Sequence, residues 1–122
     1  MAIHRSILAA IGAGLALLPI VALAHARLDH ASPAIGSTVT QPPTEVSLWF
    51  TEALEAKFST IEVRDAQGRS MQAGPATLAR DNTAQLRVPL KPMAPGIYKV
   101  IWRVLSVDTH RTQGDFTFRV GP

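Results

Sequence analysis

His25, Asp108 and His110 are the residues whose types and spacing best suit this chain to metal binding. His25 is expected to be the first residue of the mature protein, after cleavage of a signal peptide described below. A histidine at that position offers two nitrogen ligands, its free α-amino group and its ring Nδ1. The α-amino group has an ordinary pKa of about 8, so it loses its proton readily near neutral pH. Asp108 and His110 are two residues apart, so in an extended segment their side chains point to the same face.

Together these groups would supply three nitrogens and one oxygen, a tetragonal ligand set that suits Cu(II). Cu(II) also stands highest in the affinity order of divalent metals for such ligands. The chain has no cysteine, so it lacks the thiolates that favour Cu(I) or a structural zinc ion. An Asp-x-His pair alone is a weak motif, because it is usually a solvated loop. A histidine placed directly after a cleavage site makes the combination more specific.

Residues 1–24 are predicted to be a secretory signal peptide that is cleaved after Ala24. A short basic start precedes an almost unbroken apolar run over residues 7–23, and the run ends in Ala-Leu-Ala, a small-x-small cleavage pattern. The alternative is an uncleaved membrane anchor, since the run approaches the roughly 18 residues that span a bilayer. Pro19 and the Ala-x-Ala end favour cleavage, which makes His25 the first residue of an exported protein.

Residues 25–122 are expected to form one domain with a single modest core. This segment carries eleven basic and nine acidic side chains, because the signal peptide removes only Arg5 from the charged residues of the chain. The charges are scattered and form no long basic run, which argues against a nucleic-acid partner. The lack of cysteine excludes a disulfide framework, so the fold must depend on its hydrophobic core.

The apolar pattern predicts an all-β fold. Alternation of apolar and polar residues is common, helical periodicity is rare, and turn residues recur between the alternating runs. Strands are expected over residues 25–31, 45–51, 59–64, 76–78, 84–88, 96–106 and 114–120, with a turn at 65–68 and a short turn or helical loop at 52–58. About seven strands in a domain of this size are typical of an immunoglobulin-like sandwich.

The aromatic residues of these strands are expected in the core. They are Trp49, Phe50, Trp102, Phe116 and Phe118. An exposed aromatic platform for a ligand is the sharper alternative, but burial is the commoner fate of such side chains.

Four motifs in order resemble the CopC family of periplasmic copper-resistance proteins, and the match runs over the whole of residues 25–122. They are the opening His25-Ala-Arg-Leu-Asp-His-Ala-Ser-Pro-Ala-Ile-Gly-Ser, then Leu48-Trp-Phe-Thr-Glu-Ala-Leu, then Pro95-Gly-Ile-Tyr-Lys-Val-Ile-Trp-Arg-Val-Leu-Ser-Val-Asp-Thr-His, and the closing Gly114-Asp-Phe-Thr-Phe-Arg-Val. The resemblance implies a Greek-key β-sandwich that binds one Cu(II) ion in the periplasm. It also implies a carrier or buffer in copper homeostasis and resistance, with no catalytic residues.

Carried over from the family, His25 supplies its amine and imidazole, and Asp108 and His110 complete the site. Glu52 matches the family's acidic residue after the second strand, as a weak axial ligand or as a group close to the metal. The alternative for Glu52 is a plain exposed carboxylate. His30 lies five residues from His25, so its side chain falls on the opposite strand face and is expected to be a surface group rather than a ligand.

One departure from the resemblance concerns Cu(I). Some family members carry a methionine-rich loop that binds Cu(I), but the corresponding residues 64–74 hold only Met71. Met93 is alone in a proline-rich loop, and isolated methionines are usually packing residues. The chain therefore resembles the Cu(II)-only branch of the family.

Two other classes of function stay open at this point. A copper-dependent oxidative enzyme would also use an N-terminal histidine and a second histidine, but it would need an open metal position and a substrate face. A structural or interaction module is the third reading, because a β-sandwich alone does not decide function. Besides copper, the resemblance implies a separate inner-membrane copper-import protein of the CopD type as partner, and we expect the protein to be a monomer.

Overall fold

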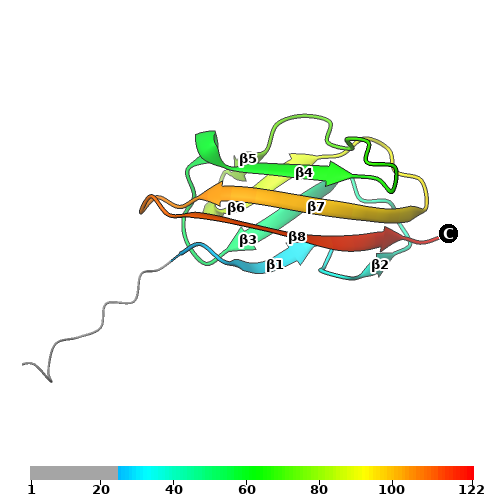
Figure 1. Cartoon of the computed structure of the whole chain (residues 1–122), viewed down its shortest axis with the longest axis horizontal. Helices are drawn as coiled ribbons and strands as arrows, with labels where there is room; N and C mark the ends of the chain where they lie inside the picture. The colour runs from blue at the N-terminus through cyan, green and yellow to red at the C-terminus, as the bar shows by residue number, and fades with distance from the viewer. Residues whose placement is uncertain (1–24) are drawn as a thin grey trace, which may run out of the picture.

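The computed structural model describes residues 25–122, so the predicted signal peptide lies outside the described part. Eight strands of this part form two sheets that pack face to face (Figure 1). One sheet contains, in spatial order, β1 (Leu28–Ser32), β3 (Glu45–Phe50), β6 (Asn82–Pro89) and β5 (Thr77–Ala79). The other contains β2 (Thr38–Val39), β8 (Arg111–Val120), β7 (Gly96–Leu105) and β4 (Thr60–Arg64). A short 3-10 helix, η1 (Ala56–Phe58), precedes β4.

The order of the strands confirms the predicted Greek-key β-sandwich, since the chain crosses repeatedly from one sheet to the other. Neighbouring strands pair antiparallel, except for the parallel pair of β2 and β8. The prediction of about seven strands missed β2. That strand has only two residues, which is too short to carry an alternating pattern.

The predicted strand ends agree with the structure to different degrees. β7 matches the expected 96–106 to within one residue, whereas β8 begins at Arg111 instead of Gly114. The sequence predicted that the first strand begins at His25, but β1 begins at Leu28. The residues before Leu28 are held by side-chain hydroxyl groups, which has consequences for the site described below.

Alternate residues of the long strands face the space between the sheets. Those buried there are Tyr98, Val100, Trp102 and Val104 of β7, Phe116, Phe118 and Val120 of β8, and Val46, Leu48 and Phe50 of β3. The rings of Phe50 and Trp102 meet edge to face across the sandwich, with centroids 5.2 Å apart. Four of the five aromatic residues expected in the core are therefore buried there.

Trp49 is the fifth, and the prediction that it belongs to the core was wrong. It is half-buried on the outer face of β3, where the alternation of the strand places it away from Leu48 and Phe50. Its ring stacks on the ring of His30, with centroids 4.4 Å apart and planes at 10°. A large aromatic side chain on an outer face gains burial from such a neighbour instead of from the core.

The two methionines of the described part are packing residues, as predicted. Met93 is buried in the core cluster, and Met71 is partly buried against it. Neither is accompanied by a histidine among the residues around it in sequence.

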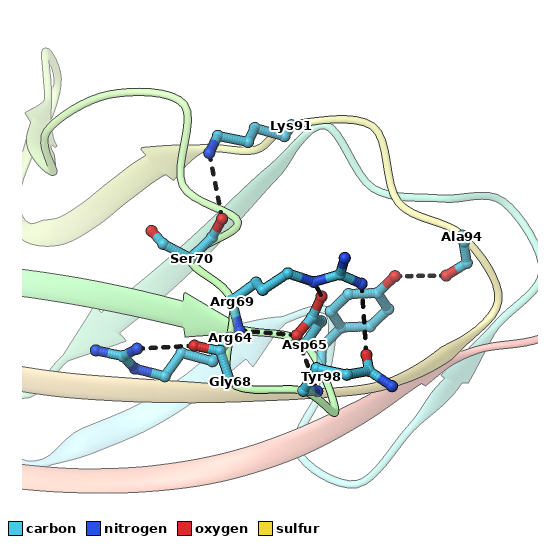
Figure 2. Close-up of polar contacts among 9 residues, drawn as sticks. Arg64, Asp65, Gly68, Arg69, Ser70, Lys91, Ala94 and Tyr98 are labelled. Atoms are coloured by element: carbon cyan, nitrogen blue, oxygen red, sulfur yellow. Dashed lines mark hydrogen bonds and ion pairs between the residues drawn. The ribbon is translucent and has the colours of Figure 1, made fainter.

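The end of the sandwich where β4 ends and β7 begins is closed by a network of polar contacts (Figure 2). Asp65 accepts hydrogen bonds from the backbone N–H groups of Gln67 and Arg69 and from the Arg69 guanidinium. These bonds hold the turn that was predicted at residues 65–68. Beside it, the Tyr98 hydroxyl donates a hydrogen bond of 2.5 Å to the carbonyl of Ala94 in the preceding loop.

The opposite end of the sandwich brings together the start of the described chain, η1 and the connection between β7 and β8 (Figure 1). The C-terminus emerges at the other end, next to β2. No helix within residues 25–122 has the length and apolar character needed to cross a bilayer.

Candidate metal site

Hydroxyl groups from both sheets hold the segment that begins at His25. The backbone N–H of Arg27 donates to Thr51 Oγ1 at 3.0 Å, and the N–H of Thr51 donates to the carbonyl of Arg27 at 2.9 Å. From the other sheet, Thr112 Oγ1 donates to the carbonyl of Ala26 at 2.7 Å. The methyl group of Ala26 is fully buried in the core, whereas His25 is exposed. The segment is thus fixed at Ala26, while the side chain of His25 before it remains accessible to solvent.

Asp108 and His110 lie on the connection between β7 and β8, and this stretch is not extended, which was the condition of the spacing argument. Residues 107–109 form a turn, in which Thr109 adopts a left-handed conformation with φ 72°. The N–H of Thr109 donates to the carbonyl of Ser106 at 2.9 Å, and the N–H of Ser106 donates to the carbonyl of His110 at 3.0 Å. The turn still brings the two side chains together, with His110 Nδ1 3.3 Å from Asp108 Oδ2.

Ser106 orients the carboxylate of this turn. Its side chain is fully buried, and its hydroxyl donates a hydrogen bond to Asp108 Oδ1. Ser106 Oγ also accepts a hydrogen bond of 3.3 Å from the backbone N–H of His110. The hydrogen bond from Ser106 lowers the pKa of Asp108; partial burial opposes this effect, and the nearby His110 lowers the pKa further. The Asp108 carboxylate therefore stays ionised to a lower pH than an ordinary aspartate.

The rings of His25 and His110 lie against each other, although they are 85 positions apart in sequence. Their centroids are 4.3 Å apart and their planes meet at 84°. Nδ1 of His110 is buried and makes no hydrogen bond within the described residues, although Asp108 Oδ2 lies 3.3 Å from it. A buried imidazole nitrogen without a partner is rare in a folded protein, and a ring in this state is not committed to holding the fold together.

Glu52 lies between two residues that contact the segments of the site. Thr51, the residue before it, makes hydrogen bonds with the backbone of Arg27. The carbonyl of Ala53, the residue after it, accepts a hydrogen bond of 3.0 Å from the N–H of Val107. The Glu52 side chain is half-buried, which is less exposed than the plain surface carboxylate of the alternative reading. Its backbone position is close to both segments, as a supporting group would require.

Across residues 25–122, no three His, Cys, Asp or Glu side chains are already gathered in a geometry that could hold a metal ion. The ligand set predicted from sequence does not rest on side chains alone, because one of its nitrogens is the α-amino group of His25. In the uncleaved chain this nitrogen is an amide bonded to Ala24, and an amide N–H is not a basic ligand. The donor set fits a metal ion only after the bond before His25 has been cut.

His30 is a surface residue, as predicted. Its Nδ1 lies 2.7 Å from Asp29 Oδ2, and both side chains are largely exposed. Its ring is committed to the stack on Trp49. The contacts of His30 therefore separate it from the pair formed by His25 and His110.

Sequence reasoning missed the three hydroxyl groups that position the candidate ligands, those of Thr51, Ser106 and Thr112. A signal was present for Ser106, which precedes Asp108 by two positions at the end of a strand and so had a good chance of lying on the same side. No sequence pattern linked Thr112 to Ala26, because the two residues are 86 positions apart and meet only through the fold.

Comparison with known proteins identifies the family of this domain. The model of the CopC domain matches residues 28–121. The protein YobA of Escherichia coli strain K12 is 39% identical over 98 residues, which cover 80% of this chain and 79% of YobA. Copper resistance protein C of Xanthomonas campestris pv. juglandis is 34% identical over 105 residues, which cover 81% of this chain and 82% of that protein.

A solved structure agrees with these sequence matches. The crystal structure of CopC from Methylosinus trichosporium OB3b superposes with a TM-score of 0.75 at 33% identity, covering 80% of this chain and 95% of that one. Fold, motifs and relatives thus agree along the described domain, and the chain belongs to the CopC family of copper-related proteins.

Proposed function

We propose that this chain is a periplasmic Cu(II)-binding protein that acts as a copper carrier or buffer in copper homeostasis and resistance. After removal of residues 1–24, it binds one Cu(II) ion through the amine and imidazole of His25, the carboxylate of Asp108 and the imidazole of His110. The observation that carries the proposal is the contact of the two imidazole rings, 4.3 Å apart, beside a carboxylate 3.3 Å from one of them.

The chemistry of these donors favours Cu(II) over other metals. Imidazole and amine nitrogens with one carboxylate oxygen form a set for which Cu(II) has the highest affinity among divalent first-row metals. The absence of cysteine removes the thiolates that would favour Cu(I) or structural zinc. The packing roles of Met71 and Met93 give no support to a separate thioether site for Cu(I).

Each residue has a distinct task in capture. His25 supplies two nitrogens from one residue, so the second bond to the metal loses little further entropy. Asp108 supplies negative charge, and the hydrogen bond from Ser106 holds its carboxylate in place. Glu52 assists as a weak axial ligand or as a group close to the metal. Because the ligands must lose protons before they bind, affinity falls as the solution is acidified, which gives a route for release.

Capture and delivery, rather than turnover, follow from this arrangement. The protein is proposed to act as a monomer that exchanges copper with a separate inner-membrane copper-import protein of the CopD type. The proposal needs no catalytic residue and no bound organic cofactor.

The test is a Cu(II) titration against a competing chelator, with protein processed to begin at His25. A matched protein with one additional residue before His25 serves as the control, because it differs only in lacking a free amine on that histidine. We expect tight one-to-one binding by the first protein and much weaker binding by the second. Equal affinity of the two, or weak binding by both, would contradict the proposed ligand set.

A further inference from the structure

We infer that Thr112 is a positioning residue for the N-terminal ligand. Its hydroxyl fixes the backbone at Ala26 and thereby holds the amine and ring of His25 beside His110. This inference rests on the proposed function, because it concerns the same Cu(II) site. It assigns a task to a residue that is not itself a ligand.

The contact between Thr112 and Ala26 is the only side-chain hydrogen bond in the described part that ties the N-terminal segment to the second sheet. Thr112 Oγ1 donates to the Ala26 carbonyl at 2.7 Å, a short distance for such a bond. Thr112 belongs to β8 and is half-buried. Thr112 follows His110 by two residues. The strand that begins directly after the proposed ligand His110 therefore also holds the segment that carries the other proposed imidazole ligand, His25.

Ala26 is fixed at more than one point, which limits the motion of the residue before it. Its methyl group is fully buried, and its carbonyl accepts the hydrogen bond from Thr112. The carbonyl of His25 lies 3.4 Å from Thr51 Oγ1, at the limit of a hydrogen bond. Since the peptide bond between His25 and Ala26 is planar, few rotations remain for His25. These are its own ψ angle and the torsions of its side chain.

A ligand held in this way binds with less loss of conformational entropy. Fixing the backbone of one residue carries a cost in conformational entropy, and a preorganised segment has already met that cost on folding. Without the Thr112 hydroxyl, part of that cost would fall on metal binding. The His25 ring would also lose its fixed distance from His110.

Thr112→Val is the direct test, because valine keeps the shape and β-branching of threonine and removes only the hydroxyl. In protein that begins at His25, we expect Cu(II) affinity about threefold to tenfold lower, the range that one hydrogen bond spans. Thr112→Ser retains the hydroxyl and should bind like the unchanged protein. Thr117→Val makes the same chemical change at an exposed position of β8 and should have no effect.

A measurement without metal separates positioning from a general effect on binding. In the metal-free protein, the backbone order parameter of the Ala26 amide should fall in Thr112→Val, from a value near that of rigid backbone. It should be restored in Thr112→Ser. Thermal unfolding of each variant establishes that the domain is folded at the temperature of the titration.

The outcomes distinguish this inference from the proposed function. Versions with one residue added before His25 lack the free amine but keep the imidazole ring, so Thr112→Val should weaken their residual binding by a smaller factor. Equal affinity of Thr112→Val and the unchanged protein, when both begin at His25 and bind tightly, would overturn the role of Thr112 and leave the Cu(II) site intact. If the unchanged protein binds no better than its extended version, the proposed function itself fails.

Discussion

The imidazole ring of His110 packs edge to face against that of His25, and its Nδ1 lies 3.3 Å from Asp108 Oδ2. One ring thus contacts a group from each of the two segments that form the candidate site. These segments come from the start of the described chain and from the β7–β8 connection, so the site exists only when the sandwich is folded.

We expect His110→Ala to lower Cu(II) affinity by more than about a hundredfold. Loss of a group that only supports a ligand already costs about 10–100-fold, and His110 is proposed as a ligand itself. Chelator competition measures the change. His30→Ala is the matched control, because it removes an imidazole that is committed to Trp49 and Asp29, and it should leave affinity unchanged. A similar loss from both substitutions would contradict the assignment.

We expect Ser106→Ala to destabilise the metal-free protein by about 1–2 kcal/mol, because it leaves the N–H of His110 and one oxygen of Asp108 without the hydroxyl. Urea unfolding measures this change. The pKa of Asp108 should rise, since the hydrogen bond from Ser106 is the main cause that lowers it. A carbon NMR titration of the carboxyl group measures that pKa. An unchanged pKa would mean that Ser106 does not orient the carboxylate.

We expect Gly114→Ala to lower the free energy of unfolding by about 1–3 kcal/mol, the usual effect of overpacking. Gly114 pairs with Trp102 between β8 and β7, and an added Cβ would lie 2.5 Å from Cζ2 of the indole ring. The ring would have to move within the core beside Phe50. Urea unfolding followed by tryptophan fluorescence tests this. Gln113→Ala, at the exposed position next to it, should change stability by less than about 0.5 kcal/mol.

We expect Asp65→Asn to remove part of the acid sensitivity of the fold. Burial raises the pKa of Asp65, but the hydrogen bonds from Arg69 and Gln67 and the charge of Arg69 outweigh it and lower the pKa below its usual value. A carboxyl group with a lowered pKa stabilises the folded state above its unfolded pKa of about 3.9. That stability is lost as the pH falls through the lower, folded-state pKa.

Asn at position 65 keeps one acceptor oxygen for the turn in Figure 2 but cannot ionise. The variant should be less stable than the unchanged protein at pH 7, and the difference should shrink as the pH approaches 2. Thermal unfolding over this pH range tests the prediction. A constant difference at every pH would mean that the charge of Asp65 does not stabilise the turn.

Much of the fold was predictable from alternation, because buried and more exposed positions of β4, β7 and β8 follow it along each strand. The error at Trp49 came from weighing its aromatic character above its register. The alternation of β3 had placed it opposite Leu48, on the outer face. The two-residue strand β2 could not be predicted, because its pairing with β8 depends on contacts between residues distant in sequence.

The candidate ligands were predictable from residue type and spacing, but their supports were not. The spacing argument placed Asp108 and His110 together on the condition that their segment is extended, but the two side chains meet through a turn with Thr109 at φ 72°. A turn can also bring residues two positions apart together, and spacing alone does not distinguish it from a strand. Hydrogen bonds such as that of Thr112 to Ala26 join distant segments, and no local pattern encodes them.

The placement of the two chain ends has a practical consequence for how this protein can be handled. Pro122 is exposed at the end of the sandwich away from the β7–β8 connection (Figure 1). An affinity tag, a sensor chip or an electrode attached through Pro122 would leave His25 and His110 pointing away from the support. In protein processed to begin at His25, as proposed, attachment through its α-amine would instead convert that nitrogen to an amide. Immobilised protein should therefore be anchored by its carboxyl end.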